Sequence, residues 1–135
     1  AHLGLPARGR ELEFPVDDED RRALRDAWPA HAECASWVCV HPGSQLASRR
    51  WPTARFAEVA RAVQAAGHTV VLTGGVAERP LAVAIERVLP APIVDLTGRT
   101  SLGALGALLA GARALVANDT SVSHIAAAIG CPSVV

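Results

Sequence analysis

The sequence contains no methionine, no lysine and no tyrosine. A chain without methionine does not begin at an initiator residue, and this one stops at CPSVV, which has the pattern of a strand. We therefore expect a piece of a larger protein, although processing of an N-terminus would also remove methionine. All 13 basic residues are arginine, which together with the frequent alanine indicates a GC-rich coding bias rather than a function.

Several classes of function are disfavoured by other absences. The net charge is zero, so there is no electrostatic argument for binding nucleic acid or an anionic membrane. No apolar stretch approaches the roughly 20 uncharged residues of a membrane span, and no signal-peptide pattern opens the chain. The motifs GxGxxG and GxxxxGKS/T are missing, which disfavours NAD binding by the usual fingerprint and P-loop NTPase activity. Because no GxSxG elbow occurs, Asp119, Ser121 and His124 do not indicate a hydrolase triad.

The chain has three cysteines, Cys34, Cys39 and Cys131. Their number is odd and their spacings match no zinc-binding pattern. Cys39 and Cys131 lie in apolar runs, so we expect both to be small buried side chains in a reducing compartment.

The length of 135 residues is enough for one domain with a real core, and half of the residues are hydrophobic. Residues 1–35 differ from the rest because they combine glycine, proline and charges with little periodicity. We expect them to form a connecting segment with one short helix, capped by Asp17 or Asp18 and ended by Pro29.

From residue 36 onwards, short apolar runs alternate with stretches of helical periodicity. Strands are predicted within residues 36–43, 68–75, 91–98 and 112–119, and a fifth opens at 131. Helices are predicted within residues 52–67, 77–90, 100–112 and 120–130. The first begins with Pro52 at its N1 position and buries Phe56, Val59, Ala60 and Val63. The apolar stripes expected on the next two are Leu81, Ile85 and Val88, then Leu102, Leu105 and Leu109.

This alternation predicts an α/β fold with a doubly wound, mostly parallel, Rossmann-like sheet. The strands are continuous apolar runs, as expected when helices cover both faces of a sheet. Such sheets bind ligands at the carboxyl ends of their strands, near the point where the strand order reverses.

A polar stretch, NDTSVSH (118–124), lies where the fourth strand ends and the next helix begins. The first turn of a helix has unpaired N–H groups and a positive partial charge, which hold a phosphate well. Ordinary N-capping by Asp119 or Thr120 and packing of His124 remain the alternative interpretation. Polar or glycine-rich segments also follow the first three strands, at 41–44, 73–75 and 96–101, where simple turn formation is the alternative.

The segments HPGSQLASRRWP, VVLTGGVAE and VDLTGRTSLGALGALLAGARALVANDTSVSHIAAAIGCPSVV resemble the C-terminal half of family 9 glycosyltransferases, the heptosyltransferases of lipopolysaccharide core assembly. The resemblance covers about residues 36–135. It implies one half of a GT-B enzyme, in which this domain binds the nucleotide-sugar donor, typically ADP-heptose. The other domain would hold the lipopolysaccharide core acceptor and supply an aspartate base for inverting transfer. It implies no cofactor and no tightly bound metal.

The resemblance also assigns roles to individual residues. The family motif D-T/S-G-x-x-H matches Asp119, Thr120, Ser121 and His124, where backbone amides and a hydroxyl hold the diphosphate. It also implies that Gly43 and Ser44 contact phosphate and that Arg49 clamps the diphosphate. Glu78 would accept hydrogen bonds from the ribose hydroxyls, and the loop that contains Thr97 and Thr100 would contact the nucleobase. For Arg49 and Glu78 the alternative is a solvated surface charge.

Two residues depart from the family pattern. Ser121 replaces the usual glycine, which matters if this position needs a positive φ or backbone contact with phosphate, and Arg49 stands where relatives often have lysine. They favour the alternative hypothesis, a non-catalytic Rossmann-like nucleotide-binding or interaction domain. The motif HPGS…RRWP disfavours a third hypothesis, that the chain is part of another GT-B enzyme such as a sugar-nucleotide epimerase.

For the full protein, the resemblance implies a cytoplasmic enzyme at the inner face of the inner membrane. Peripheral contact with that membrane is expected only there, and no nucleic acid partner is expected. The chain alone is expected to be inactive because the acceptor-binding half is missing.

Overall fold

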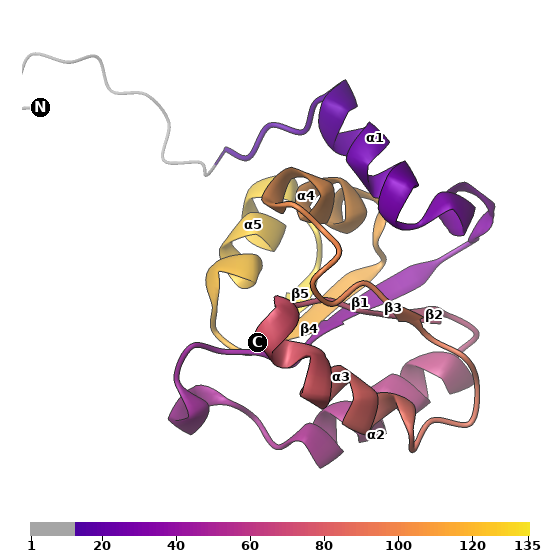
Figure 1. The fold of residues 1–135 in the computed structure, drawn as a ribbon, viewed down its shortest axis with the longest axis vertical. Coiled ribbons are helices and arrows are strands. Elements are labelled where there is room, and N and C mark those ends of the chain that lie inside the picture. The colour runs from indigo at the N-terminus through magenta and orange to yellow at the C-terminus, as the bar shows by residue number, and fades with distance from the viewer. Residues whose placement is uncertain (1–12) are drawn as a thin grey trace, which may run out of the picture.

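The computed structural model describes residues 13–135, so residues 1–12 of the expected connecting segment lie outside the described part (Figure 1). The core is a five-stranded, fully parallel sheet in the order β3-β2-β1-β4-β5. Its strands are β1 (Trp37–His41), β2 (Thr69–Leu72), β3 (Val94–Asp95), β4 (Ala114–Ala117) and β5 (Ser133–Val134). The parallel Rossmann-like sheet predicted from the alternation of strands and helices is confirmed.

β1 is the central strand and pairs with both β2 and β4. Val38 is in register with Val70 on one side and with Ala114 on the other. The chain runs outward from β1 to β2 and β3, then returns to the other side of β1 with β4 and β5. The strand order therefore reverses between β1 and β4, and a crevice is expected where the carboxyl ends of these two strands diverge.

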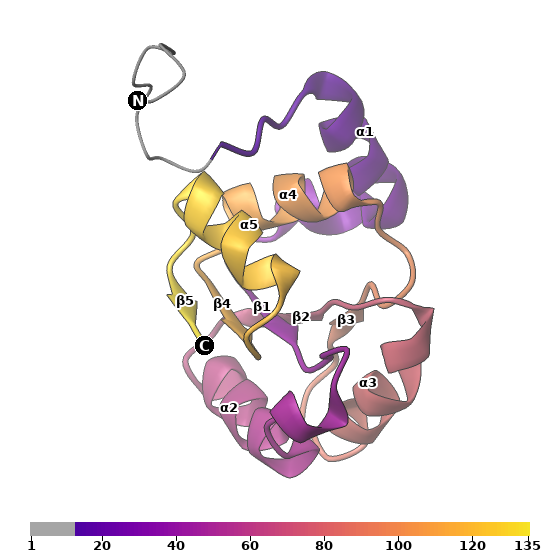
Figure 2. The same cartoon turned by 90° about the vertical axis from the view of Figure 1, so that its left-hand side faces the viewer.

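Helices cover both faces of the sheet (Figures 1 and 2). The helices are α1 (Asp18–Ala27), α2 (Thr53–Ala65), α3 (Arg79–Glu86), α4 (Leu102–Gly111) and α5 (Ser121–Ile129). The connections between strands and helices within residues 13–135 contain three 3-10 turns: η1 (Pro29–Glu33), η2 (Ala47–Arg49) and η3 (Val76–Glu78). α2 and α3 lie on one face, where Phe56, Ala60 and Ile85 pack against Val70 and Leu72. α4 and α5 lie on the other face, and α1 packs over α4.

The short helix expected in the first segment is α1, and Asp17 is its N-cap. The Asp17 Oδ1 accepts a hydrogen bond from the Asp20 N–H at 2.9 Å, and Asp20 Oδ2 accepts one from the Asp17 N–H at 3.1 Å. This reciprocal capping box satisfies two N–H groups of the helix start. The helix ends at Ala27, two residues before Pro29.

α1 approaches α4 closely because glycines on α4 leave room for it. The Asp20 carboxylate lies against Gly103, and the ring of Phe14 lies against Gly106, so a Cβ at either glycine would overlap these groups. Leu24 and Trp28 continue the contact into the core on this face of the sheet.

Trp28 and Trp37 meet edge to face in that core, with their ring centroids 5.3 Å apart. The Trp37 Nε1–H donates to the Leu108 carbonyl at 3.2 Å, so the buried indole is satisfied. These contacts join α1, β1 and α4 into one packed layer.

The apolar stripes predicted for α3 and α4 are partly wrong. On α3 the buried residues are Ala82 and Ile85, and Val88 is 51% exposed because the helix ends at Glu86. On α4, Leu102 is 60% exposed at the first turn.

The buried positions of α4 are Ala104, Gly106, Ala107, Leu108 and Leu109. α4 packs against α5 and α1 as well as facing the sheet, so no single stripe describes its buried surface. In α2, Pro52 is the N-cap rather than the first helical residue.

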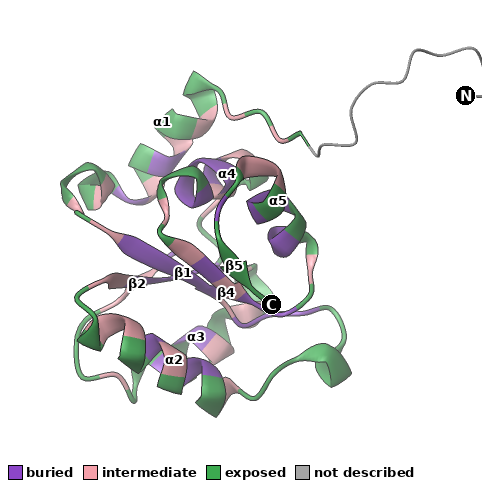
Figure 3. Cartoon of the chain, turned by 180° about the vertical axis from the view of Figure 1, so that it is seen from behind, coloured by how far each residue is buried: buried purple, intermediate pink, exposed green. Residues whose placement is uncertain are grey.

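Figure 3 shows the buried strands at the centre and exposed residues on the outer faces of the helices. β5 is an edge strand, and both of its residues are exposed. Within residues 13–135, no helix has the length and apolar character needed to cross a membrane.

Candidate functional site

A cavity of about 370 Å³ lies at the carboxyl ends of β1 and β4, where the strand order reverses. Two segments line it: the loop after β1, and the junction between β4 and α5. Its lining residues are Ser44, Gln45, Leu46, Arg49, Asp119, Thr120, Ser121 and His124. The crevice expected from the sheet topology is therefore present, and it is large enough for part of a small-molecule ligand.

The N-terminus of α5 opens on this cavity without a side-chain cap. Thr120 is the N-cap residue, with extended backbone angles (φ −145°, ψ 178°), but its side chain makes no capping hydrogen bond. Its Oγ1 is buried and has no partner among the described residues. Ordinary N-capping by Thr120 is therefore not what the structure shows. The positive end of the helix dipole remains available to an anion.

Arg49 brings a cationic side chain to the same cavity from the opposite segment. It ends η2, and its N–H donates to the Leu46 carbonyl at 3.0 Å. The next residue, Arg50, turns back and donates from Nε to the Ser44 carbonyl at 3.0 Å. A guanidinium and a helix N-terminus on one cavity form a suitable site for a phosphate or diphosphate.

Ser121 is not strained by replacing glycine. No non-glycine residue between 13 and 135 has a positive φ, and Ser121 is the first residue of α5. Serine was expected to fit poorly if this position needed a positive φ or backbone contact with phosphate, and the structure shows that it does not need a positive φ. Its side chain, exposed at the rim, is still more bulk than glycine would place there.

Glu78 does not line the cavity but lies next to it. It ends η3, after β2, and its side chain crosses to the loop after β1, where it lies directly against Gly43. A Cβ at Gly74 would be 3.0 Å from the Glu78 Cβ, and a Cβ at Gly75 would be 3.0 Å from its Oε2. The glutamate is half-buried in this glycine-lined cradle rather than fully solvated.

His41, the last residue of β1, lies near that glutamate. Its Nδ1 is 2.9 Å from the Thr73 Oγ1, which is hydrogen-bonding distance. Burial lowers the pKa of His41, and the nearby Glu78 carboxylate opposes this shift without cancelling it. The imidazole is therefore neutral at pH 7.

The loop after β3 holds Thr97 and Thr100, which do not line the cavity either. Thr97 is 1% exposed, its N–H donates to Asp95 Oδ1 at 2.9 Å, and its Oγ1 has no partner among the described residues. The Gly98 N–H donates to the Gly74 carbonyl at 2.8 Å, which ties this loop to the one after β2. Thr100 is half-buried, just before Ser101, the N-cap of α4.

The structure thus divides the ten predicted residues into two groups. Ser44, Arg49, Asp119, Thr120, Ser121 and His124 line the cavity, and Gly43 adjoins it. Glu78, Thr97 and Thr100 follow along the same edge of the sheet, on the loops after β2 and β3.

Sequence reasoning missed Gln45 and Leu46, which also line the cavity, and the hydrogen bonds of Asn118. Gln45 and Leu46 lie within the segment HPGSQLASRRWP, but the family resemblance assigns no role to either. Asn118 does open the polar stretch 118–124, which was the only signal for it.

A second cavity, of about 540 Å³, shares Arg49 and Asp119 with the first. Trp51, Phe56 and Val134 give it a more apolar lining, and the two aromatic rings meet edge to face with centroids 5.2 Å apart. No group of three or more potential metal ligands clusters anywhere in the described part of the chain.

A sequence profile described as "Glycosyltransferase family 9 (heptosyltransferase)" matches residues 1–135. The chain belongs to glycosyltransferase family 9. The resemblance inferred from its motifs is therefore confirmed.

Curated members of family 9 are similar in sequence. Lipopolysaccharide heptosyltransferase 1 of Pseudomonas aeruginosa is 33% identical over 133 residues, which cover 90% of this chain and 35% of that protein. Lipooligosaccharide heptosyltransferase 2 of Haemophilus influenzae is 33% identical over 96 residues, covering 67% of this chain and 28% of that protein. The chain thus spans about a third of the length of these family 9 relatives.

Solved family 9 structures share the fold. A family 9 glycosyltransferase from Veillonella parvula superposes with a TM-score of 0.86 at 24% identity, covering 97% of this chain and 38% of that one. The ADP-heptose LPS heptosyltransferase II of Escherichia coli gives 0.82 at 25% identity, covering 96% and 40%. The E. coli heptosyltransferase WaaC, in a structure with ADP, gives 0.65 at 24% identity, covering 73% and 32%. The predicted α/β, Rossmann-like fold is confirmed, and it matches part of GT-B heptosyltransferase structures.

Proposed function

We propose that this chain is the C-terminal, donor-binding domain of an inverting heptosyltransferase that uses ADP-heptose. The observation that carries the proposal is the cavity between β1 and β4. There the uncapped N-terminus of α5 and the guanidinium of Arg49 offer two positive groups to one anion. A diphosphate suits such a site better than a neutral ligand because both groups favour negative charge.

In this proposal the diphosphate lies between Ser44, Arg49 and the first turn of α5. The buried Thr120 hydroxyl, which has no hydrogen-bond partner within residues 13–135, is a donor for it, as are the N–H groups of that turn. Asp119 is exposed on the same cavity, and its carboxylate would repel phosphate. Its suitable partners are therefore hydroxyl groups of the sugar, which donate hydrogen bonds.

The ribose and the base extend from the diphosphate toward β2 and β3. Glu78, held in its glycine cradle, accepts hydrogen bonds from the ribose hydroxyls. Thr97 and Thr100 meet the base, mainly through the main chain of their loop, which adjoins that of β2. ADP is the nucleotide that we propose because relatives by fold include a heptosyltransferase solved with ADP.

The reaction proposed for the full enzyme joins a lipopolysaccharide inner-core hydroxyl to the anomeric carbon of heptose. The acceptor oxygen forms the new bond while the bond from that carbon to the diphosphate oxygen breaks, and ADP leaves with the electron pair. The acceptor proton passes to an aspartate of the other domain. This chain would stabilise the charge that develops on the leaving diphosphate, through Arg49 and α5, which is often the largest contribution to catalysis.

The acceptor binds through the other domain, so this chain alone is proposed to be inactive. The full enzyme would work in the cytoplasm at the inner face of the inner membrane, where the core of lipopolysaccharide is assembled, and it would need no cofactor or tightly bound metal. A second candidate, a Rossmann-like binding domain without catalysis, is favoured by Ser121 in place of glycine and Arg49 in place of lysine.

Isothermal titration of the 135-residue chain distinguishes donor binding from an interaction domain that binds no nucleotide. With ADP, UDP and inorganic phosphate as ligands, we expect micromolar affinity for ADP and weaker binding of the other two. Micromolar binding corresponds to about 8 kcal/mol, which a diphosphate site with base contacts can supply. A chain that binds none of the three ligands would refute donor binding and leave the interaction domain as the better hypothesis.

A further inference from the structure

Asn118 is a buried side chain whose bonds serve the loop after β1 rather than the cavity. It is 6% exposed, at the carboxyl end of β4. Its Nδ2 donates to the Pro42 carbonyl at 2.9 Å and lies 3.4 Å from the Gly43 carbonyl. Its Oδ1 accepts a hydrogen bond from the Trp51 N–H at 2.8 Å. One amide thus binds both ends of the segment from Pro42 to Trp51.

Between these two anchors the loop has little else to hold it. Residues 45–50 are all exposed, and the only regular structure is the single turn of η2. The bond from Arg50 to the Ser44 carbonyl closes the loop on itself but not on the sheet. The position of Arg49 relative to α5 therefore depends on the amide at the base of the loop.

The amide at position 118 meets two opposite needs. Pro42 and Gly43 offer carbonyl oxygens and require a donor, whereas the Trp51 N–H requires an acceptor. An apolar residue of similar size would leave these buried groups unpaired, which is costly. Aspartate would keep the acceptor but would place a carboxylate against the Pro42 oxygen.

We propose that Asn118 is a positioning residue, which fixes the loop 42–51 and thereby holds Arg49 on the same cavity as the N-terminus of α5. The proposal rests on the proposed function, because it assigns the ordered arginine to the diphosphate of the donor. Asn118 does not line the cavity proposed to hold the diphosphate, although it lines the adjoining second cavity. Holding the arginine in place before binding reduces the conformational entropy lost when the diphosphate binds.

Amide hydrogen exchange, followed by NMR on the 135-residue chain, tests the anchoring directly. The Trp51 amide should be protected in the wild type and should exchange about tenfold faster or more in Asn118→Leu, while amides of β2 keep their protection. In Asn118→Asp the Trp51 amide should stay protected, because the carboxylate still accepts its hydrogen bond. Ser36→Ala is the matched control, since it loses a side-chain contact to His68 (2.7 Å) at the opposite end of the sheet. Unchanged exchange of Trp51 in Asn118→Leu would overturn the proposal.

Titration with ADP tests whether the anchoring acts through Arg49. In the wild type and in Ser36→Ala, Arg49→Ala should weaken ADP binding by about tenfold, as expected for one lost charge-assisted contact. In Asn118→Leu the same substitution should cost about twofold or less, because the arginine is no longer held at the site. An equal cost of Arg49→Ala in all three backgrounds would overturn the proposal.

The two arms also distinguish a failure of this proposal from a failure of the proposed function. If the wild-type chain does not bind ADP, donor binding is refuted, and so is the role of Asn118 in donor binding. The exchange of the Trp51 amide would still show whether Asn118 orders the loop.

Discussion

The side chain of Glu78 lies directly against the backbone of Gly43, so that a Cβ at residue 43 would overlap the Cγ of Glu78. The two residues come from the loops after β2 and β1, and this contact places the glutamate beside the cavity. The carboxylate can therefore keep this position only because residue 43 is glycine, which has no Cβ.

Gly43→Ala should displace Glu78 and weaken ADP binding by roughly three- to tenfold, the loss of about one hydrogen-bonded contact. Its effect on the free energy of unfolding should be small, because the overlapping atom belongs to a side chain that can move. Gly67→Ala is the control: residue 67 has φ +89° with open space around it, so the substitution costs stability, about 1 kcal/mol, and not affinity. Calorimetry measures the affinity for ADP, and urea unfolding measures the free energy of unfolding. If Gly43→Ala still weakens binding in a Glu78→Ala background, it does not act through Glu78.

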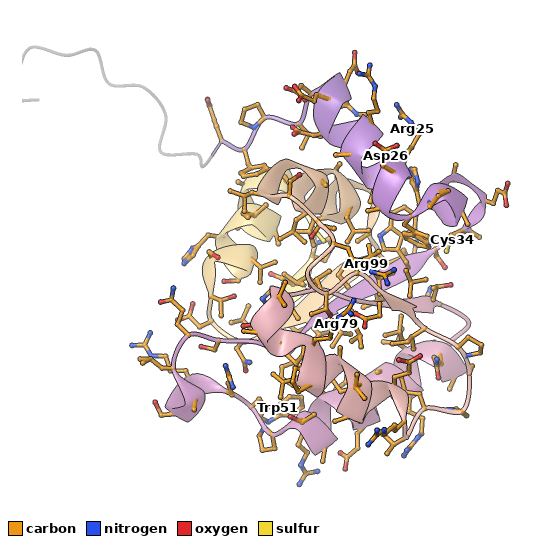
Figure 4. The ribbon with its side chains drawn as sticks, viewed as in Figure 1. Arg25, Asp26, Cys34, Trp51, Arg79 and Arg99 are labelled. Carbon is orange, nitrogen blue, oxygen red and sulfur yellow. The ribbon has the colours of Figure 1, made fainter. Side chains whose placement is uncertain are left out.

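Asp119→Ala, introduced into the full-length enzyme, should lower turnover by about tenfold or more, since the carboxylate is proposed to bind the transferred sugar. Asp119 is exposed, so the melting temperature should change little. Asp26→Ala removes another exposed carboxylate, on α1 away from the cavity, and should leave turnover unchanged (Figure 4). Wild-type turnover in Asp119→Ala would remove this residue from the mechanism.

His41 should make the folded chain less stable in mild acid. Burial lowers its pKa in the folded state, whereas the unfolded state keeps the ordinary value near 6.5. As the pH falls below about 7, the unfolded state therefore binds a proton that the folded state does not, and the free energy of unfolding decreases. His41→Gln, which does not titrate, should show a smaller decrease between pH 7.5 and 5.5 in urea unfolding. An identical decrease in both proteins would contradict a neutral buried imidazole.

The three cysteines should differ sharply in reactivity. Burial raises the pKa of the Cys39 thiol, with a smaller contribution from nearby Cys131, and burial also raises the pKa of Cys131. Cys34 is only partly buried. Because the thiolate is the reactive form, iodoacetamide at pH 8 should modify Cys34 first and Cys39 only after unfolding in urea. Peptide mass mapping would show this, and Cys34→Ser should abolish the rapid phase. Rapid modification of Cys39 in the native chain would contradict its burial.

The sheet was predictable from the sequence because strands buried on both faces leave continuous apolar runs, such as Val70–Leu72. The buried faces of the helices were less predictable from the sequence. Periodicity assumes one apolar face for each helix, but α4 is covered on several sides, and close contacts at Gly103 and Gly106 leave no hydrophobic signal.

The place of the candidate site was also predictable, because parallel strands bring their carboxyl ends to one edge and a reversal of strand order opens a crevice there. Thus Arg49 and Asp119, far apart in the sequence, were expected near each other and do line one cavity. The anchoring by Asn118 was not predictable, since it depends on how two loops turn relative to β4. The ligand contacts assigned to these residues stay predictions.

The chain has no tyrosine and three tryptophans, and the structure separates those tryptophans into two kinds. Trp28 and Trp37 meet edge to face in the core, whereas Trp51 is 45% exposed on the other face of the sheet, in the segment that Asn118 anchors (Figure 4). Tryptophan fluorescence therefore comes from two separate sites, the buried pair Trp28 and Trp37 and the exposed Trp51. Quenching by iodide, an anion drawn to Arg49 and Arg50, would report on the loop next to Trp51. Emission from the shielded pair, Trp28 and Trp37, would report on unfolding of the core, so one sample can follow both.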